Sequence, residues 1–317
     1  MRAIICGSVA FDTIMNFDGH FHDQILPDRL HMLNVAFLVP QLRREFGGCA
    51  GNIAYNMRLL GDLGVPTATV GADAGRYLAW MREHGIPTGS IKVLGGTHTA
   101  QAFITTDQDD NQITAFHPGA MNSSHVNKVG TGLDIGLGVI APDGREGMLQ
   151  HAEQFAAANI PFLFDPGQGL PMFNGEELRA FVKQASWVAV NEYEWHLLND
   201  RTGLNESDVA GQVRALIVTR GAEGSTIYVG NERILIPPAK TCTVIDPTGC
   251  GDAYRAGILH GLLNNLDWPT TGRVASLMGA LKIEVRGTQN HRFTQSEFDG
   301  RYRQHFGARM GRISGRA

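Results

Sequence analysis

Short apolar runs alternate with helical segments along most of this chain, and no other feature of the sequence restricts the fold as strongly. Residues 2–9 are predicted to form a short buried strand, and residues 51–60 carry apolar side chains at helical spacing. The alternation continues through predicted strands at 65–70, 139–141, 161–164, 187–190, 215–219 and 225–229, with predicted helices at 77–84 and 149–158. Such alternation is typical of an α/β fold, in which helices cover both faces of a mainly parallel sheet.

Two segments interrupt the alternation, at about 14–45 and 96–118. The second is rich in Thr, Phe and Ile around a turn-like Asp109-Asp110-Asn111, which predicts a β-hairpin. We expect these segments to form a small lid of strands over the central sheet. Because the chain has no internal repeat and no low-complexity linker, it is expected to be one domain over 1–317 with a flexible tail at about 307–317.

Composition and charge exclude several classes of protein. Apolar residues make up 43% of the chain and charged residues 18%, which excludes a disordered chain, and the 39 glycines follow no period of three, which excludes collagen. The net charge is −4 and arginines cluster only near the C-terminus, so no nucleic-acid partner is expected.

No apolar run approaches the roughly 20 residues that cross a bilayer, and no signal peptide is recognised. We therefore expect a cytoplasmic protein with no membrane partner. The four cysteines form no CxxC pair, which argues against a zinc site.

The strongest chemical signal is the segment DPTGCGD at 246–252, which is followed by an apolar helical run. The amides of Gly249, Cys250 and Gly251 would lie at the positive end of this helix, where free N–H groups bind anions such as phosphate. An ionised Asp252 beside such a site would accept a hydroxyl proton during phosphoryl transfer. The alternative is that Asp252 is an ordinary helix cap.

A second glycine-rich turn, GGCAGN at 47–52, precedes the first long predicted helix. Gly47 and Gly48 would let the backbone approach a ligand closely, and the Asn52 amide can both donate and accept hydrogen bonds. Glycine turns before helices are common, so this signal is weak without other evidence.

Two further motifs follow predicted strands. The turn that contains Thr219, Gly221 and Gly224 could hold a nucleotide phosphate, although it lacks the pattern of a Walker A loop and could equally be a hairpin turn. Asn191 and Glu194, three residues apart, would share one face of a helical turn and could hold water around Mg²⁺. The alternative is a solvated helix start.

The two glycine-rich motifs together resemble the two signatures of the ribokinase (PfkB) family of sugar and nucleoside kinases, in the correct order and about 200 residues apart. The segments HFHDQILPDRLH, AFLVP, QITAFHPGAM and NEYEWHLL resemble the bacterial adenosine and nucleoside kinase branch. The resemblance covers nearly the whole chain. It implies a ribokinase-like fold and ATP- and Mg²⁺-dependent phosphorylation of the 5′-hydroxyl of a purine nucleoside.

The resemblance also assigns roles to individual residues. It implies that Asp252 is the general base and that the amides of Gly249, Cys250 and Gly251 form the anion hole. The substrate-binding residues that it implies are Ser8, Asp12, Gly47, Gly48, Asn52, Phe116 and Gln168. The implied ATP-binding residues are Asn191, Thr219, Gly221 and Gly224, with Glu194 holding Mg²⁺ through water and Asp246 near a monovalent cation such as K⁺.

The sequence departs from the family pattern at three positions. Pro247 and Cys250 replace the commoner threonine and alanine, and neither change removes a backbone amide needed for the anion hole. Ala102 stands where adenosine-specific relatives carry a second aromatic side chain. Because stacking contributes about 0.5–1.5 kcal/mol beyond burial, its loss predicts broader use of purine nucleosides.

Several alternatives remain at this point. A Rossmann-type dehydrogenase would need GxGxxG after the first strand, where this chain has GSVA. A non-catalytic ligand sensor on the same fold would not need Asp252. Within the family, a sugar such as ribose or fructose is the alternative acceptor. The resemblance also raises a homodimer formed through the lid.

Overall fold

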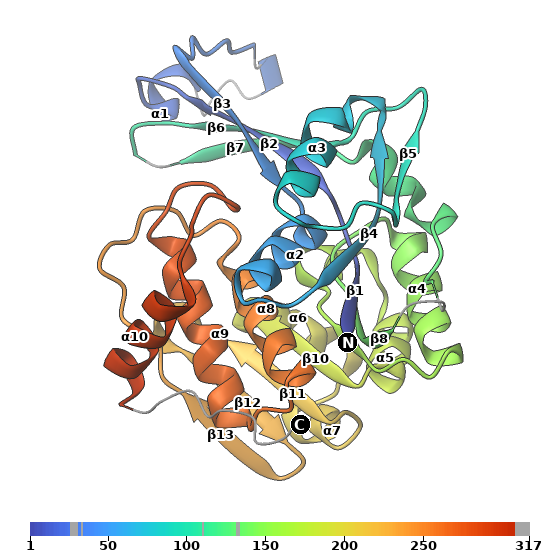
Figure 1. Ribbon diagram of the computed structural model, residues 1–317. Helices are drawn as coiled ribbons and strands as arrows, with labels where there is room; N and C mark the ends of the chain where they lie inside the picture. The colour runs from blue at the N-terminus through green and yellow to red at the C-terminus, as the bar shows by residue number, and fades with distance from the viewer. Residues whose placement is uncertain (26–30, 33, 110, 131–133, 308–317) are drawn as a thin grey trace.

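The computed structural model describes residues 1–25, 31–32, 34–109, 111–130 and 134–307. The predicted tail beyond Gly307 lies outside the described residues. A nine-stranded sheet runs in the order β13-β12-β11-β10-β9-β8-β1-β4-β5 (Figure 1). Its strands are β1 (Arg2–Cys6), β4 (Gly64–Gly71), β5 (Ile91–Leu94), β8 (Ile135–Ile140), β9 (Phe162–Phe164), β10 (Trp187–Asn191), β11 (Ala215–Thr219), β12 (Ser225–Val229) and β13 (Glu232–Ile236).

Helices cover both faces of this sheet, as the sequence predicts (Figure 1). Neighbouring strand residues point to opposite faces, so Ile5 packs with α2 and α8 while Ile4 packs with α4 and α5. The helices are α1 (Phe21–Gln24), α2 (Cys49–Leu59), α3 (Gly75–Glu83), α4 (Arg145–Ala157), α5 (Gly175–Gln184), α6 (Glu192–Thr202), α7 (Glu206–Ala210), α8 (Cys250–Leu263), α9 (Trp268–Ile283) and α10 (Gln295–Phe306). Short 3₁₀ segments lie at Ala72–Ala74, Gly119–Val126, Gly167–Met172 and Gly221–Glu223.

A second, four-stranded sheet forms the lid. Its order is β3-β2-β6-β7, from strands β2 (Ala10–Asn16), β3 (Gln41–Gly47), β6 (Ala100–Thr106) and β7 (Gln112–His117). The register pairs Asp12 with Ala102 and Ala102 with Phe116, so these three residues lie in a row across one face of the lid. Strand β2 begins four residues after β1 ends, which brings Asp12 into the lid.

The α/β fold with a small β-lid is confirmed, and two details of it were not predicted. Strands β5 and β13, which are short edge strands with exposed residues, were not predicted from the sequence. The direction of β12, which pairs antiparallel with both β11 and β13, was not predicted either. No helix among the described residues has the length and apolarity needed to cross a membrane.

The parallel strands bring the predicted motifs to one edge of the sheet. Strands β1, β8, β9, β10 and β11 are parallel, so their carboxyl ends meet at the same edge. Asn191 pairs directly with Thr219 at the ends of β10 and β11. The N-terminus of α8 lies in the same region, next to the start of α2, as the hydrogen bond from Asn52 in α2 to Asp252 in α8 shows. In open α/β sheets, this edge is where ligands bind.

Candidate active site

Two cavities meet at the N-terminus of α8, and Gly251 lines both. The first cavity, about 520 Å³, lies between the lid and the central sheet. The second, about 570 Å³, lies between the β11–β12 turn and the α8–α9 pair. Of the predicted residues, the first cavity is lined by Ser8, Asp12, Gly48, Asn52, Phe116, Gln168, Gly249 and Asp252, and the second by Thr219, Gly221, Gly224 and Cys250. A further hollow of about 750 Å³ lies at the opposite edge, where Pro161, Ser186 and Arg214 precede β9, β10 and β11.

The loop before α8 has the conformation that an anion site needs. Gly249 has φ +79° and is the N-cap of α8, and an added Cβ would lie 3.0 Å from the side chain of Thr288. The amides of Gly249 and Gly251 have no hydrogen-bond partner among the described residues. The Cys250 amide donates to the Pro247 carbonyl at 3.1 Å. Two of the three predicted anion-binding amides are therefore free in this conformation.

Asp252 lies in the first turn of α8 and is held by a chain of amides. Asn52 Nδ2 donates to Asp252 Oδ2 at 2.7 Å, and Gln289 Nε2 donates to Asn52 Oδ1 at 2.7 Å. Gln289 thereby fixes which end of the Asn52 amide faces the carboxylate. Burial raises the pKa of Asp252 to about 7, and the hydrogen bond from Asn52 opposes this rise. A carboxylate with a pKa near neutrality is suited to act as a general base.

A buried ion pair lies beside Asp252. Arg255, one turn along α8, donates to Asp165 Oδ1 through Nε at 3.1 Å and Nη2 at 2.9 Å, and its Nη2 lies 3.9 Å from Glu194 Oε2. The Asp165 carboxylate raises the pKa of Asp252 further, while the Arg255 guanidinium lowers it. Arg255 also lines the second cavity, so it contacts that space and the buried carboxylate at once.

The glycine pair before α2 positions Asp12. A Cβ added to Gly47 would lie 2.4 Å from Asp12 Oδ2, so only glycine leaves room for this carboxylate. Gly48 has φ +85°, and a Cβ there would meet the backbone of Ser8 and Ala10. Burial raises the pKa of Asp12 to about 6, and repulsion from nearby acidic groups adds to the rise. The Ser8 hydroxyl accepts from the Cys49 amide at 3.1 Å and so caps α2.

The lid supplies the apolar wall of the first cavity. Phe116 is 52% exposed, so its ring is free to contact a ligand, and Ala102 beside it leaves space in the same wall. Gln168 lies opposite, in the 3₁₀ segment Gly167–Met172, and its Nε2 is 3.8 Å from Cys49 Sγ. A flat apolar group with polar edges fits between these walls.

Asn191 and Glu194 form the start of α6. Glu194 accepts from the Asn191 backbone amide at 2.8 Å and from its side chain at 2.8 Å, so the pair is a capping box. Burial raises the pKa of Glu194. The Glu194 oxygens keep lone pairs beyond these two bonds, so they can accept hydrogen bonds from water bound to Mg²⁺ rather than bind the ion directly. Neither residue lines the second cavity, which Glu194 approaches through its contact with Arg255.

The predicted monovalent cation site at Asp246 does not fit the residues present. Lys282 Nζ donates to the Asp246 carbonyl at 2.7 Å and to the Val285 carbonyl at 3.2 Å, and it lies 4.0 Å from Asp246 Oδ1. The Lys282 ammonium group therefore occupies the position at which a monovalent cation would contact these oxygens. The sequence interpretation overlooked Lys282 because it lies 36 residues after Asp246, outside any motif.

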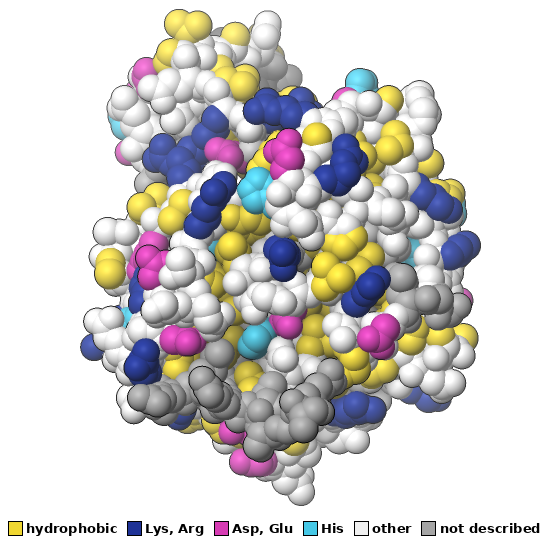
Figure 2. All heavy atoms as spheres, in the orientation of Figure 1, with side chains coloured by type: hydrophobic (Ala, Val, Ile, Leu, Met, Phe, Trp, Pro, Cys, Tyr) yellow, Lys and Arg dark blue, Asp and Glu magenta, His cyan; other side chains and the backbone are white. Residues whose placement is uncertain are grey.

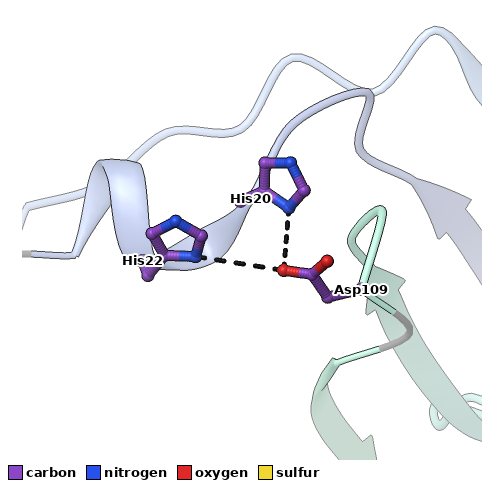
Figure 3. Close-up of side chains that lie close together, drawn as sticks. All are labelled: His20, His22 and Asp109. Atoms are coloured by element: carbon purple, nitrogen blue, oxygen red, sulfur yellow. Dashed lines mark hydrogen bonds and ion pairs between the residues drawn. The ribbon is translucent and has the colours of Figure 1, made fainter.

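A cluster of His20, His22 and Asp109 lies in the lid, outside both cavities (Figure 3). His20 Nδ1 is 2.8 Å from Asp109 Oδ2, and His22 Nδ1 is 4.0 Å from the same oxygen. These contacts connect α1 to the β6–β7 turn.

Over the face seen in Figure 2, lysine and arginine side chains are interspersed with acidic ones.

The residues that orient Asp252 were not predicted from the sequence. Gln289, Asp165 and Arg255 act through contacts between positions 90 to 237 residues apart in the chain. Arg255 lies three residues after the segment 246–252, in the apolar helical run, where a charged side chain indicates that a partner of opposite charge exists. Gln289 belongs to no recognised pattern.

Comparisons with known proteins identify the family of this chain. The model of the pfkB family of carbohydrate kinases matches residues 10–294. A nucleoside kinase of Burkholderia thailandensis, solved in complex with inosine, is 51% identical, with a TM-score of 0.88 over 97% of this chain and 99% of that chain. The same enzyme has been solved in complex with ADP-inosine. A nucleoside kinase of Methanocaldococcus jannaschii is 30% identical over 295 residues, which cover 92% of this chain and 93% of the relative.

Proposed function

The chain belongs to the pfkB family of carbohydrate kinases, and from this premise we propose that it transfers the γ-phosphoryl group of ATP to the 5′-hydroxyl of a purine nucleoside. It is a phosphotransferase whose acceptor is an alcohol. The observation that carries the proposal is the pair of cavities that meet at Gly251, with Asp252 on the side of the first. Phosphoryl transfer requires this arrangement, because donor and acceptor must approach in line across an anion site.

The first cavity is assigned to the nucleoside. The ribose hydroxyls bind Asp12 and Asn52, and the base stacks on Phe116 and meets Gln168 at its edge. This assignment is supported by the shared lid face of Asp12 and Phe116. It is further supported by the relative with 51% identity, whose structure contains inosine. The space beside Ala102 accommodates more than one purine, so inosine, adenosine and guanosine are all expected substrates.

The second cavity is assigned to ATP. Thr219, Gly221 and Gly224 contact the nucleotide, and the γ-phosphoryl group points toward the amides of Gly249 and Gly251. Asp252 accepts the proton of the 5′-hydroxyl as the oxygen attacks phosphorus. The free amides at the helix N-terminus then stabilise the charge on the transferred oxygens. Closure of the lid would exclude water and so limit hydrolysis of ATP.

Glu194 is the residue assigned to Mg²⁺, which it would hold through water. When bound, Mg²⁺ neutralises the developing charge on the phosphate oxygens. Arg255, which lines the second cavity, holds Glu194 and Asp165 beside it. We do not assign a monovalent cation to Asp246, since Lys282 stands there.

A homodimer through the lid is also proposed. The lid face opposite Asp12 exposes Leu42, Phe103 and Ile113, at 64%, 40% and 43%. Burial of these side chains against a second copy would remove apolar surface from water. Sedimentation of the wild type and of Leu42→Asp tests this: a dimer that the substitution dissociates is expected, and a wild-type monomer at all concentrations contradicts it.

A substrate panel tests the proposed reaction. ATP consumption is measured with adenosine, inosine, guanosine, cytidine, ribose or fructose as acceptor, and the product is identified by mass spectrometry. Purine nucleosides are expected to have the highest kcat/KM, because only they fill the apolar wall at Phe116 as well as the ribose site. Faster turnover of free ribose or fructose would contradict the assignment and favour a sugar kinase.

A further inference from the structure

We propose that the ammonium group of Lys282 permanently occupies the monovalent-cation site predicted at Asp246. This site lies beside residues 246–251, which carry the amides predicted to bind phosphate and which we call the anion loop. The enzyme would then need no monovalent cation for phosphoryl transfer. This inference rests on the proposed nucleoside kinase activity. It assigns Lys282 as a positioning residue, which acts through Asp246 and the loop that follows it rather than on the substrate.

The charge of Lys282 lies in the protein interior. Lys282 is the last but one residue of α9, and its side chain is fully buried, at 0% exposure. A buried ammonium is costly unless oxygen atoms surround it. Its Nζ donates to two backbone carbonyls, those of Asp246 and Val285, and faces Asp246 Oδ1. Carbonyl and carboxylate oxygens from two loops thus converge on one cation.

Asp246 connects Lys282 to the anion loop. Asp246 uses every polar atom it has: Oδ1 accepts from the Thr248 amide at 2.9 Å, and Oδ2 accepts from the Gly287 amide at 2.8 Å. Its own amide donates to the Ile283 carbonyl at 3.1 Å. Thr248 directly precedes Gly249, so the position of Asp246 sets the position of the first anion-binding amide. Removal of the charge at Lys282 would leave the Asp246 carbonyl with only the weak contact from the Cys250 thiol at 3.9 Å, would take this donor from the Val285 carbonyl, and would loosen the loop.

The Lys282 ammonium group and a free alkali cation would compete for one position. An alkali cation bound here would need the same oxygens that Lys282 Nζ already contacts, and two cations could not share them. A tethered ammonium also costs no binding entropy at each turnover, unlike an ion taken from solution. A positioned loop then affects the rate of transfer more than the binding of nucleoside, since displacement of catalytic groups by about 1 Å can cost about 10²-fold.

The experiment compares the wild type with Lys282→Ala, Lys282→Met and Lys92→Met in tetramethylammonium, Na⁺ or K⁺ as the sole monovalent cation. Lys92→Met is the matched control, because Lys92 also donates to a backbone carbonyl, that of Val126, but lies in β5 away from both cavities. Rates of inosine phosphorylation and melting temperatures are measured in each salt. Lys282→Met keeps the aliphatic chain and serves if the alanine variant does not fold.

The wild type and Lys92→Met are expected to work equally well in all three salts. Lys282→Ala and Lys282→Met are expected to lose at least about tenfold in kcat with little change in the nucleoside KM. K⁺ should restore part of the activity of Lys282→Ala and raise its melting temperature relative to tetramethylammonium, because the vacated oxygens can then bind the free ion.

Strong activation of the wild type by K⁺ would overturn the inference, as would unchanged kcat in both Lys282 variants or the absence of any rescue in Lys282→Ala. Failure of the proposed function gives a different result, namely no phosphorylation of inosine by the wild type in any of the salts. The two hypotheses are therefore tested separately by the same set of measurements.

Discussion

At the scale of single residues, the proposed reaction depends on one carboxylate whose environment is set from several parts of the chain. Asp252 occupies the first turn of α8, where the helix dipole favours its charged form. Burial acts in the opposite direction and raises its pKa to about 7. Asn52 and Gln289 orient it from α2 and from the segment after α9. The sequence motif predicts that Asp252 is the general base, whereas the pKa and orientation of this carboxylate depend on contacts that no local pattern encodes.

The raised pKa predicts how activity depends on pH. The base must be ionised to accept a proton, so kcat/KM for inosine should rise with pH and reach half its maximum near pH 7, the pKa of Asp252. Initial rates between pH 5 and 9 check this. A profile that is flat across this range would show that ionisation of Asp252 does not limit the reaction.

The same shift predicts a gain in stability when the charge is removed. The pKa of Asp252 is higher in the folded state, at about 7, than the ordinary value of 3.8, so ionisation costs folding free energy between these pH values. Asp252→Asn should therefore match the wild type near pH 4 and have a higher melting temperature above pH 7. Thermal unfolding followed by circular dichroism measures this difference. A difference in melting temperature, variant minus wild type, that is smaller at pH 8 than at pH 4 would contradict this prediction.

Gly47 provides a second test at this scale. Gly47→Ala should displace the Asp12 carboxylate, because the new Cβ would approach Oδ2 to 2.4 Å. Nucleoside KM is expected to rise at least about tenfold while ATP binding is retained, a loss of about 1.4 kcal/mol. Gly75→Ala is the control, since a Cβ there meets nothing within 4 Å. Equal kinetics for the two variants would remove Asp12 from the nucleoside site.

At the scale of elements, the register of the lid decides what the first cavity can bind. Pairing of β2 with β6 and of β6 with β7 aligns Asp12, Ala102 and Phe116 on one face. The hairpin at 96–118 was predicted from its turn and its strand-forming residues. Its pairing with β2 could not be predicted, because parallel pairing between distant segments leaves no mark in the local sequence. That Phe116 and Asp12 lie on the same face of the lid could therefore be seen only in the structure.

Replacement of the aromatic side chain tests this wall. Phe116→Ala should raise the nucleoside KM and leave the ATP KM nearly unchanged, with a loss of at least about 0.5–1.5 kcal/mol from stacking. Leu235→Ala is the control, because Leu235 is an exposed apolar residue on β13, outside both cavities. Equal losses for nucleoside and ATP would argue against stacking of the base on Phe116.

At the scale of the whole molecule, two cavities are arranged around one helix end. The alternation of strands and helices predicted the parallel sheet, and parallel strands necessarily bring their carboxyl ends to one edge. The positions of Asn191 and Thr219 followed from this topology. The lid contributes only to the first cavity, so its response to ligands should depend on which cavity is filled.

Hydrogen exchange measures that response. Inosine alone is expected to slow amide exchange in β6 and β7, because it contacts the face of the lid that carries Phe116. ATP alone should instead protect the β11–β12 turn and the start of α8, which line the second cavity. Protection of the lid by ATP alone, with none from inosine, would reverse the assignment of the two cavities.

The central claim is that Asp252 accepts the proton of the nucleoside 5′-hydroxyl between the two cavities. Single-turnover transfer from ATP to inosine tests it most directly, with the phosphorylated position identified by ³¹P NMR and the Asp252→Asn variant compared at equal occupancy of both ligands. The wild type should yield inosine 5′-monophosphate, and the variant should be slower by about 10²–10⁴-fold. A variant that retains more than about a tenth of the wild-type rate, or phosphate on another hydroxyl, would contradict the account.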